Sequence, residues 1–176
     1  APKGVMLTYR NISSNIQFGL SELPNGPGDN IVSMLPMAHM YGMAFEYIYQ
    51  LAGGTQVFFL GKVPSPKVLL DALATVQPYM LITVPLVIEK IFKSSVFPTI
   101  RKPVVKSIMK VPGLASVIHK QIRKKLLHAF GGKIRSIVIG GAAINQEVED
   151  LMKIIKLPYT VGYGMTECAP LLSYED

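Results

Sequence analysis

The stretch Ile134-Arg135-Ser136-Ile137-Val138-Ile139-Gly140-Gly141 sets the pattern from which we predict the fold. A short apolar run rich in β-branched residues ends in two glycines, as expected of a buried strand followed by a tight turn. Asn145 then caps a helix whose first turn is acidic, and the next apolar run, 159–161, again ends in glycine. This order predicts parallel strands joined through a helix.

The same alternation of strand and helix continues toward the N-terminus. Thr8 and Ser65 are suited to cap helices, and Gly53-Gly54 closes an apolar helical run. Further strands are predicted at 31–35, 55–60 and 80–84, and helices at 8–20, 41–51, 65–76, 85–93, 102–110 and 115–130. Because the strands are short and apolar, we predict an α/β fold with a parallel sheet layered with helices on both faces.

The composition fits one domain or a large piece of one. The chain has 176 residues, of which 49% are hydrophobic, so it can bury a sizeable core. Cys168 is the only cysteine, which excludes an internal disulfide and suits a reducing compartment. The sequence shows no signal pattern and no apolar run of membrane-spanning length. We therefore expect a cytoplasmic location, with peripheral attachment to the inner face of a membrane left open.

Charge is distributed unevenly along the chain. Residues 90–146 contain 12 Lys/Arg and no Asp/Glu, whereas the remainder contains 6 basic and 11 acidic residues, which together make the net charge of +7. The simplest interpretation of the block from Lys90 to Arg135 is a solvated helical face. Contact with an anionic membrane is a second interpretation. Nucleic acid is not expected, because the block contains no recognised reader motif.

Three groups of polar or flexible residues follow predicted strands, and the carboxyl ends of parallel strands are where such sheets bind ligands. After residue 161, the Tyr163 ring could stack on a flat ligand, Thr166 could donate to a phosphate oxygen, and Glu167 could hold a magnesium ion that phosphate also ligates. Gly140-Gly141 would allow close backbone approach. A polar turn at each strand end is the simpler alternative.

His39 follows the strand at 31–35 among apolar neighbours. A histidine in this setting is more often a hydrogen-bonded core residue than a ligand-binding one, and both interpretations stay open. Zinc is not expected, since His119 and His128 share no metal-ligand spacing with His39 or Cys168.

Four motifs in order resemble those of the adenylate-forming (AMP-binding) superfamily, which includes acyl-CoA synthetases, luciferases and peptide-synthetase adenylation domains. They are Pro2-Lys3-Gly4-Val5, Leu35-Pro36-Met37-Ala38-His39, Gly140-Gly141-Ala142-Ala143 and Tyr163-Gly164-Met165-Thr166-Glu167. The overall sequence is most similar to long-chain fatty-acid–CoA ligases. Many relatives carry proline where this chain has Ala143.

The resemblance implies a role for each motif. Gly140, Gly141, Ala142 and Ala143 would form one side of an adenine site and Tyr163 the other, with Gly164, Met165 and Thr166 completing nucleotide contact. Glu167 would hold Mg²⁺, Lys3 would belong to a loop over the ATP phosphates, and His39 would lie beside the acyl carboxylate and the CoA route. Thr166, Glu167 and His39 are the candidate catalytic residues, and ATP, Mg²⁺, CoA and a fatty acid are the implied ligands.

The resemblance further implies that residues 1–176 are a central fragment of the large adenylation domain. We expect the start of the phosphate loop and the C-terminal small domain to be missing, and the fragment alone to be inactive. The expected reaction converts a carboxylic acid, most simply a long-chain fatty acid, to an acyl-adenylate and then to acyl-CoA. The alternatives are transfer to a carrier-protein thiol and a non-catalytic basic module that binds membranes or nucleic acid.

Overall fold

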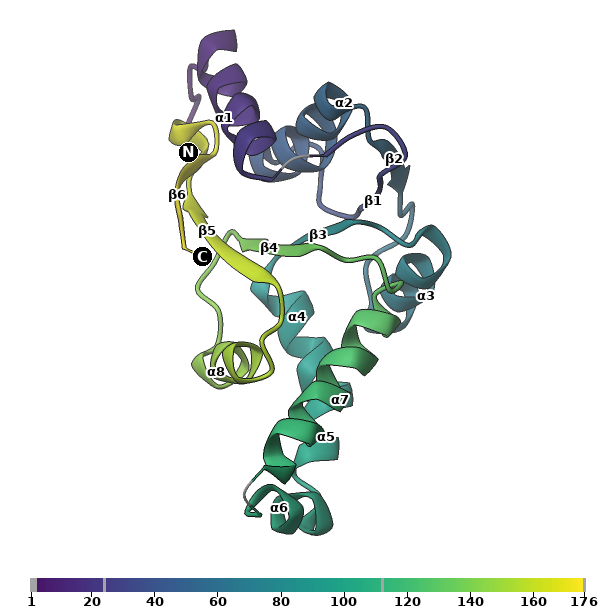
Figure 1. Cartoon of the computed structure of the whole chain (residues 1–176). Coiled ribbons are helices and arrows are strands. Elements are labelled where there is room, and N and C mark those ends of the chain that lie inside the picture. The colour runs from purple at the N-terminus through teal and green to yellow at the C-terminus, as the bar shows by residue number, and fades with distance from the viewer. Residues whose placement is uncertain (1–2, 24, 112, 176) are drawn as a thin grey trace.

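The computed structural model describes residues 3–23, 25–111 and 113–175 of the chain (Figure 1). Pro2 of the first motif, like Ala1 before it, lies outside this range. The described residues form one sheet with the strand order β2-β1-β3-β4-β5-β6. Its strands are β1 (Asn30–Ser33), β2 (Gln56–Phe59), β3 (Met80–Thr83), β4 (Ser136–Gly140), β5 (Tyr159–Gly164) and β6 (Leu171–Glu175).

The register of the sheet aligns the strand ends that carry the predicted motifs. Strands β1 to β5 are parallel, with Thr83 of β3 opposite Ile139 of β4, and Gly140 of β4 opposite Gly162 of β5. The glycine-rich end of β4 and the Gly-Tyr-Gly end of β5 are therefore neighbours at one edge of the sheet.

Helices cover both faces of this sheet (Figure 1). On one face lie α1 (Tyr9–Glu22), the π-helix η1 (Gly42–Ile48) and α2 (Tyr49–Gly53). The other face carries a larger group of helices, to which α6 is attached through α7. These are α3 (Pro66–Val76), α4 (Pro85–Ile91), η2 (Phe92–Val96), α5 (Phe97–Ile100), α6 (Pro103–Met109), α7 (Leu114–Ala129) and α8 (Gln146–Ile154).

Two separate hydrophobic cores result from the alternation of side chains along each strand. Ile31 and Ile82 pack under α1, η1 and α2, whereas Val32, Leu81 and Ile137 pack against α3, α4, α7 and α8. Strands that bury both faces must be continuously apolar. The predicted α/β fold with a parallel, doubly covered sheet is confirmed.

The predicted helix caps also form. Thr8 accepts from the Asn11 backbone N–H and Asn11 reciprocates, so α1 begins with a capping box. Ser65 caps α3, and Asn145 accepts from the backbone N–H groups of Glu147 and Val148 at the start of α8.

Three local predictions were incomplete or wrong. The helix expected at 41–51 begins as a π-helix, and the helix expected to end near residue 93 continues through η2 and α5. The Gly162-Tyr163-Gly164 segment is not a turn: it belongs to β5 and pairs with β6, an antiparallel strand that the sequence did not predict. A partner strand supplies the hydrogen bonds that hold these flexible residues extended.

Candidate functional site

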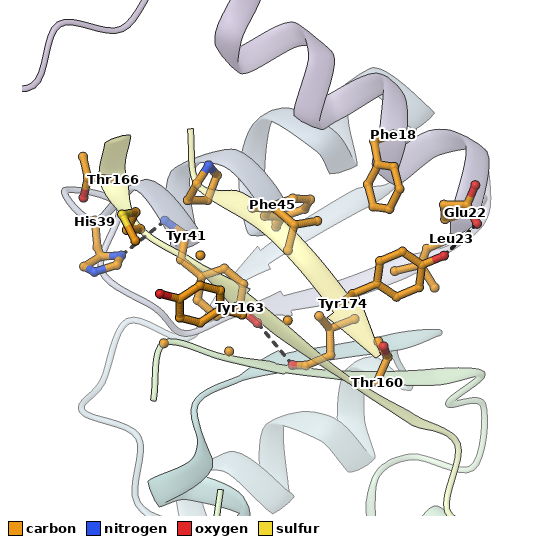
Figure 2. Close-up of a pocket in the computed structure, with 18 of the residues that line it drawn as sticks. Phe18, Glu22, Leu23, His39, Tyr41, Phe45, Thr160, Tyr163, Thr166 and Tyr174 are labelled. Carbon is orange, nitrogen blue, oxygen red and sulfur yellow. Dashed lines mark hydrogen bonds between the residues drawn. The ribbon is translucent and has the colours of Figure 1, made fainter. Parts of the chain in front are cut away.

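A cavity of about 340 Å³ lies between the carboxyl ends of β4 and β5 and the helices α1 and η1 (Figure 2). We refer to it as the central cavity. It is lined by Phe18, Glu22, Leu23, His39, Tyr41, Phe45, Val138, Gly140, Gly141, Thr160, Gly162, Tyr163, Gly164, Met165, Thr166, Glu167, Pro170, Leu171 and Tyr174.

Most of the predicted site residues line this one cavity. His39 comes from the segment after β1, Gly140 and Gly141 from the end of β4, and the remainder from the 163–167 segment at the end of β5. Figure 2 shows His39 and Thr166 at one end of the labelled side chains, with Glu22 and Leu23 at the other. Residues more than 100 positions apart in the sequence thus line a single cavity.

Three predicted residues do not line the cavity. Lys3, Ala142 and Ala143 are exposed, and none of them is among the lining residues. Gly141 adopts a φ of +91°, a conformation that suits glycine, and the chain then leaves the cavity for the Asn145 cap of α8. The glycine pair therefore contacts the cavity and the alanine pair does not.

The turn after β5 presents Thr166 and Glu167. Met165 N–H donates to the Pro170 carbonyl at 2.9 Å and Ala169 N–H donates to the Thr166 carbonyl at 3.1 Å, which closes the short 3-10 helix η3 (Thr166–Cys168). A Cβ atom on Gly164 would lie 1.9 Å from the Pro170 oxygen, so this close turn requires glycine. Both polar side chains are left exposed at the cavity.

Tyr41 is a cavity residue that the sequence analysis did not single out. Its hydroxyl lies 3.3 Å from the carbonyl oxygens of both Thr83 and Val138, and donates to them between β3 and β4. Burial raises the pKa of Tyr41 above its usual range, so the phenol stays a donor. A Cβ atom on Gly140 would lie 3.2 Å from the Tyr41 ring. In the sequence, the glycine at position 140 was the feature that could have indicated a side chain lying close to the end of β4.

His39 is exposed at the cavity, so its interpretation as a core residue is wrong. Its Nδ1 accepts a hydrogen bond of 3.2 Å from the Tyr41 backbone N–H. In the neutral imidazole the proton is therefore on Nε2, which makes Nε2 the donor toward a ligand.

Glu46 is fully buried behind the His39 segment. Its Oε2 accepts from the backbone N–H groups of Met34 and Leu35 at 3.0 and 2.8 Å and from the Ser33 hydroxyl at 3.0 Å. Burial raises the pKa of this carboxyl to about 7, and those hydrogen bonds oppose the rise. Glu46 therefore anchors the segment that leads from β1 to His39.

The end of the cavity under α1 is mainly apolar. Phe18 and Tyr174 are in ring contact, with centroids 5.3 Å apart, and the Tyr174 hydroxyl donates to Glu22 at 3.1 Å. Leu23, Phe45, Val138 and Leu171 contribute further apolar surface. Among the described lining residues there is no Lys or Arg. The cavity thus joins a polar end to an apolar end.

Glu167 is the cavity's candidate metal ligand. The described residues contain no group of three His, Cys, Asp or Glu side chains able to hold a metal together. A single exposed carboxylate does suit Mg²⁺, which keeps several waters and is commonly bound through one or two carboxylates plus substrate phosphates. One carboxylate therefore suits a Mg²⁺ ion that binds together with a nucleotide. It does not suit a structural metal held by the protein alone.

Comparison with known proteins identifies the family of the chain. Residues 1–176 match the family described as AMP-binding enzyme, and the chain belongs to that family. It is 28% identical over 184 residues to human long-chain-fatty-acid–CoA ligase 1 and 30% identical over 195 residues to long-chain-fatty-acid–CoA ligase 3 of Saccharomyces cerevisiae. Each alignment covers 95% of this chain and 26% of the relative, so the chain spans about a quarter of their length.

Solved structures support the same fold. The o-succinylbenzoate CoA synthetase of Bacillus subtilis, in complex with its acyl-adenylate intermediate, has a TM-score of 0.71 at 18% identity. That match covers 99% of this chain and 29% of the synthetase. A malonyl-CoA ligase with methylmalonyl-CoA and AMP bound has a TM-score of 0.68 at 21% identity, covering 98% of this chain and 32% of the ligase.

Proposed function

We propose that this chain forms the nucleotide and acyl site in the large domain of an AMP-forming long-chain fatty-acid–CoA ligase. The observation that supports this most directly is the two-ended central cavity. Glycine backbone, an aromatic ring, a hydroxyl and a carboxylate gather at one end. Mainly apolar side chains, together with Glu22, Thr160 and the Tyr174 hydroxyl, line the other. ATP would need the polar end of the cavity, and the chain of a fatty acid would need the apolar end.

The adenine ring would lie between the Gly140-Gly141 backbone and the Tyr163 side chain. Bare glycine peptides allow close approach to a flat ring, and an aromatic side chain provides a stacking surface. Tyr163 is 58% exposed, so its ring is available to a ligand. Ala142 and Ala143 are assigned no direct contact, because they lie outside the cavity lining.

Thr166 and Glu167 would act on the phosphates. The Thr166 hydroxyl would donate to a phosphate oxygen, and Glu167 would hold Mg²⁺, which neutralises phosphate charge when bound. The fatty-acid carboxylate oxygen would attack the α-phosphorus of ATP, forming the acyl-adenylate as pyrophosphate leaves. Lys3 would approach the phosphates only through movement of its segment.

The acyl chain would occupy the apolar end near Phe18, Phe45 and Leu171. His39 would donate from Nε2 to the carboxylate at the polar end of the cavity, with Tyr41 and Glu46 holding its segment in place. In the second step the CoA thiol would attack the acyl carbonyl, and AMP would leave. The names of the ligase relatives support a long-chain acyl group and CoA as acceptor.

ATP–pyrophosphate exchange by the full-length protein tests this proposal. Exchange should require a fatty acid, and addition of CoA should give acyl-CoA and AMP in equal amounts. A series of acids of increasing chain length would identify the preferred acyl group. Formation of ADP in place of AMP, or exchange without any dependence on fatty acid, would contradict the proposal.

A further inference from the structure

Helices α5, α6 and the N-terminal part of α7 extend away from the sheet (Figure 1). They continue the helical layer on the face opposite to α1, whereas the central cavity lies on the α1 face. This extension is therefore a surface separate from the proposed ligase site. None of the helices in the described ranges combines the length and apolar character needed to cross a bilayer.

Large apolar side chains are exposed together at the end of this extension. Val104 is 69% exposed, Val117 52%, Val111 48%, Leu114 43% and Ile108 38%. Val104 and Ile108 are four residues apart in α6, and Leu114 and Val117 are three apart in α7, so each pair lies on one helix face. Because α6 packs against α7, the two pairs lie on adjoining helices.

Exposed lysines accompany these apolar residues. We define the α6–α7 tip by the residues Lys102, Val104, Ile108, Lys110, Val111, Leu114, Val117, Lys120 and Lys124, all of which are exposed. Lys120 and Lys124 follow Val117 by three and seven positions and continue its helix face. Within the described residues none of the four lysines forms an ion pair, whereas Arg101 is bound to Glu147 at 2.6 Å.

We propose that the α6–α7 tip binds the surface of a lipid bilayer that contains anionic lipids. The valines, Ile108 and Leu114 would enter the boundary between headgroups and acyl chains, and the lysines would extend to the lipid phosphates. Residues 90–146 carry no Asp or Glu, so no nearby acidic side chain on this segment opposes that approach.

A lipid surface explains the combination better than nucleic acid does. Phosphate backbones would pair with the lysines but would leave five apolar side chains in water. Single-stranded nucleic acid is usually bound by exposed aromatic rings, whereas Phe92, Phe97 and Phe130 of this region are buried. An interfacial membrane contact uses both kinds of side chain at once.

Vesicle co-sedimentation of the full-length protein tests this proposal. Phosphatidylcholine vesicles with and without about a third phosphatidylglycerol should separate the charge requirement from general adhesion. We expect binding to the anionic vesicles, weakened as salt rises, and little binding to phosphatidylcholine alone.

Two sets of variants separate the apolar and basic contributions. We expect vesicle partitioning to fall about fivefold for each of three single changes, Lys110→Gln, Lys120→Gln and Lys124→Gln. Val104→Ser and Val117→Ser should each lower it about tenfold, including at high salt. Lys62→Gln and Val63→Ser replace exposed residues outside the tip and should not change vesicle partitioning.

Because the replaced side chains are exposed, the melting temperature and ATP–pyrophosphate exchange should stay at the unmodified values. Failure to bind anionic vesicles at low salt would overturn the proposal. The proposal would also be overturned if the Lys62 and Val63 control variants lost as much binding as the tip variants. A third contrary result is a protein that does not bind vesicles but binds oligonucleotides, and loses that binding when the lysines are changed.

Discussion

Glu46 is the residue whose ionisation should be most visible in the stability of the fold. Its pKa is raised to about 7 from an ordinary 4.5 because the carboxyl is buried. Between these two pH values the unfolded state loses a proton that the folded state keeps, so the free energy of unfolding falls as pH rises. The stabilisation that comes from the raised Glu46 pKa is fully present below about pH 4.5 and is lost by about pH 7. It amounts to roughly 3 kcal/mol in the free energy of unfolding.

Glu46→Gln should remove that component of the pH dependence. Urea unfolding at a series of pH values would give the free energy of unfolding of each protein. The difference between the two proteins isolates the effect of Glu46, because all other titrating groups are the same in both. The control is Glu22→Gln, an acid in the cavity lining. A difference that stays constant across pH 4.5 to 7 would show that Glu46 is ionised in the folded protein.

Glu167 offers a second test at a single residue, here of its proposed role in adenylate formation. Glu167→Gln keeps the shape of the side chain but removes the charge proposed to hold Mg²⁺. Because the residue is exposed, the melting temperature should barely change, whereas adenylate formation by the full-length enzyme should fall about a hundredfold. An unchanged pyrophosphate-exchange rate would exclude a role for Glu167 in the reaction.

At the level of elements, the β5–β6 connection determines the shape of the cavity's polar end. Gly164 lies against the Pro170 carbonyl, and the pairing of β5 with β6 shifts register at Tyr163 and Gly164. Gly164→Ala must move one of the two strands, so we expect a loss of about 2 to 4 kcal/mol in the free energy of unfolding. Denaturant unfolding would measure it.

Gly26→Ala is the matched control for that substitution. Within the described residues, apart from Gly26 itself and its two chain neighbours, no atom lies within 4 Å of a Cβ atom placed on Gly26, and its φ is not positive. This variant should unfold at the same denaturant concentration as the unmodified chain. Equal stability of the Gly164 and Gly26 variants would show that the β5–β6 turn adapts without cost.

For the molecule as a whole, the lining of the cavity sets an expectation for nucleotide affinity. No Lys or Arg is among the described lining residues, so a triphosphate would meet Thr166 and Glu167 without a compensating cation from the protein. The 176-residue chain alone should therefore bind MgATP with a Kd of about a millimolar or weaker. Micromolar binding by isothermal titration calorimetry would mean that the phosphates are held elsewhere.

The sequence by itself determined most of the elements and the sheet type. Strand and helix periodicity, the Thr8, Ser65 and Asn145 caps and the Gly54 helix end depend on neighbours within about four residues, and such local signals can be recognised along the chain. The placement of His39, Gly141 and Tyr163 at one sheet edge also followed, because parallel strands bring their carboxyl ends together.

Only the tertiary structure decided three features: strand β6, the positions of the half-buried Tyr41 and the buried Glu46, and the apolar end of the cavity. Asn15 shows the reason: it donates to the Cys168 carbonyl at 3.2 Å and accepts from the Leu171 N–H at 2.8 Å, across more than 150 residues of sequence. These hydrogen bonds link α1 to the turn before β6 and to the start of that strand. No local pattern encodes a pairing at that distance, since its free energy comes from groups that meet only once the sheet has formed.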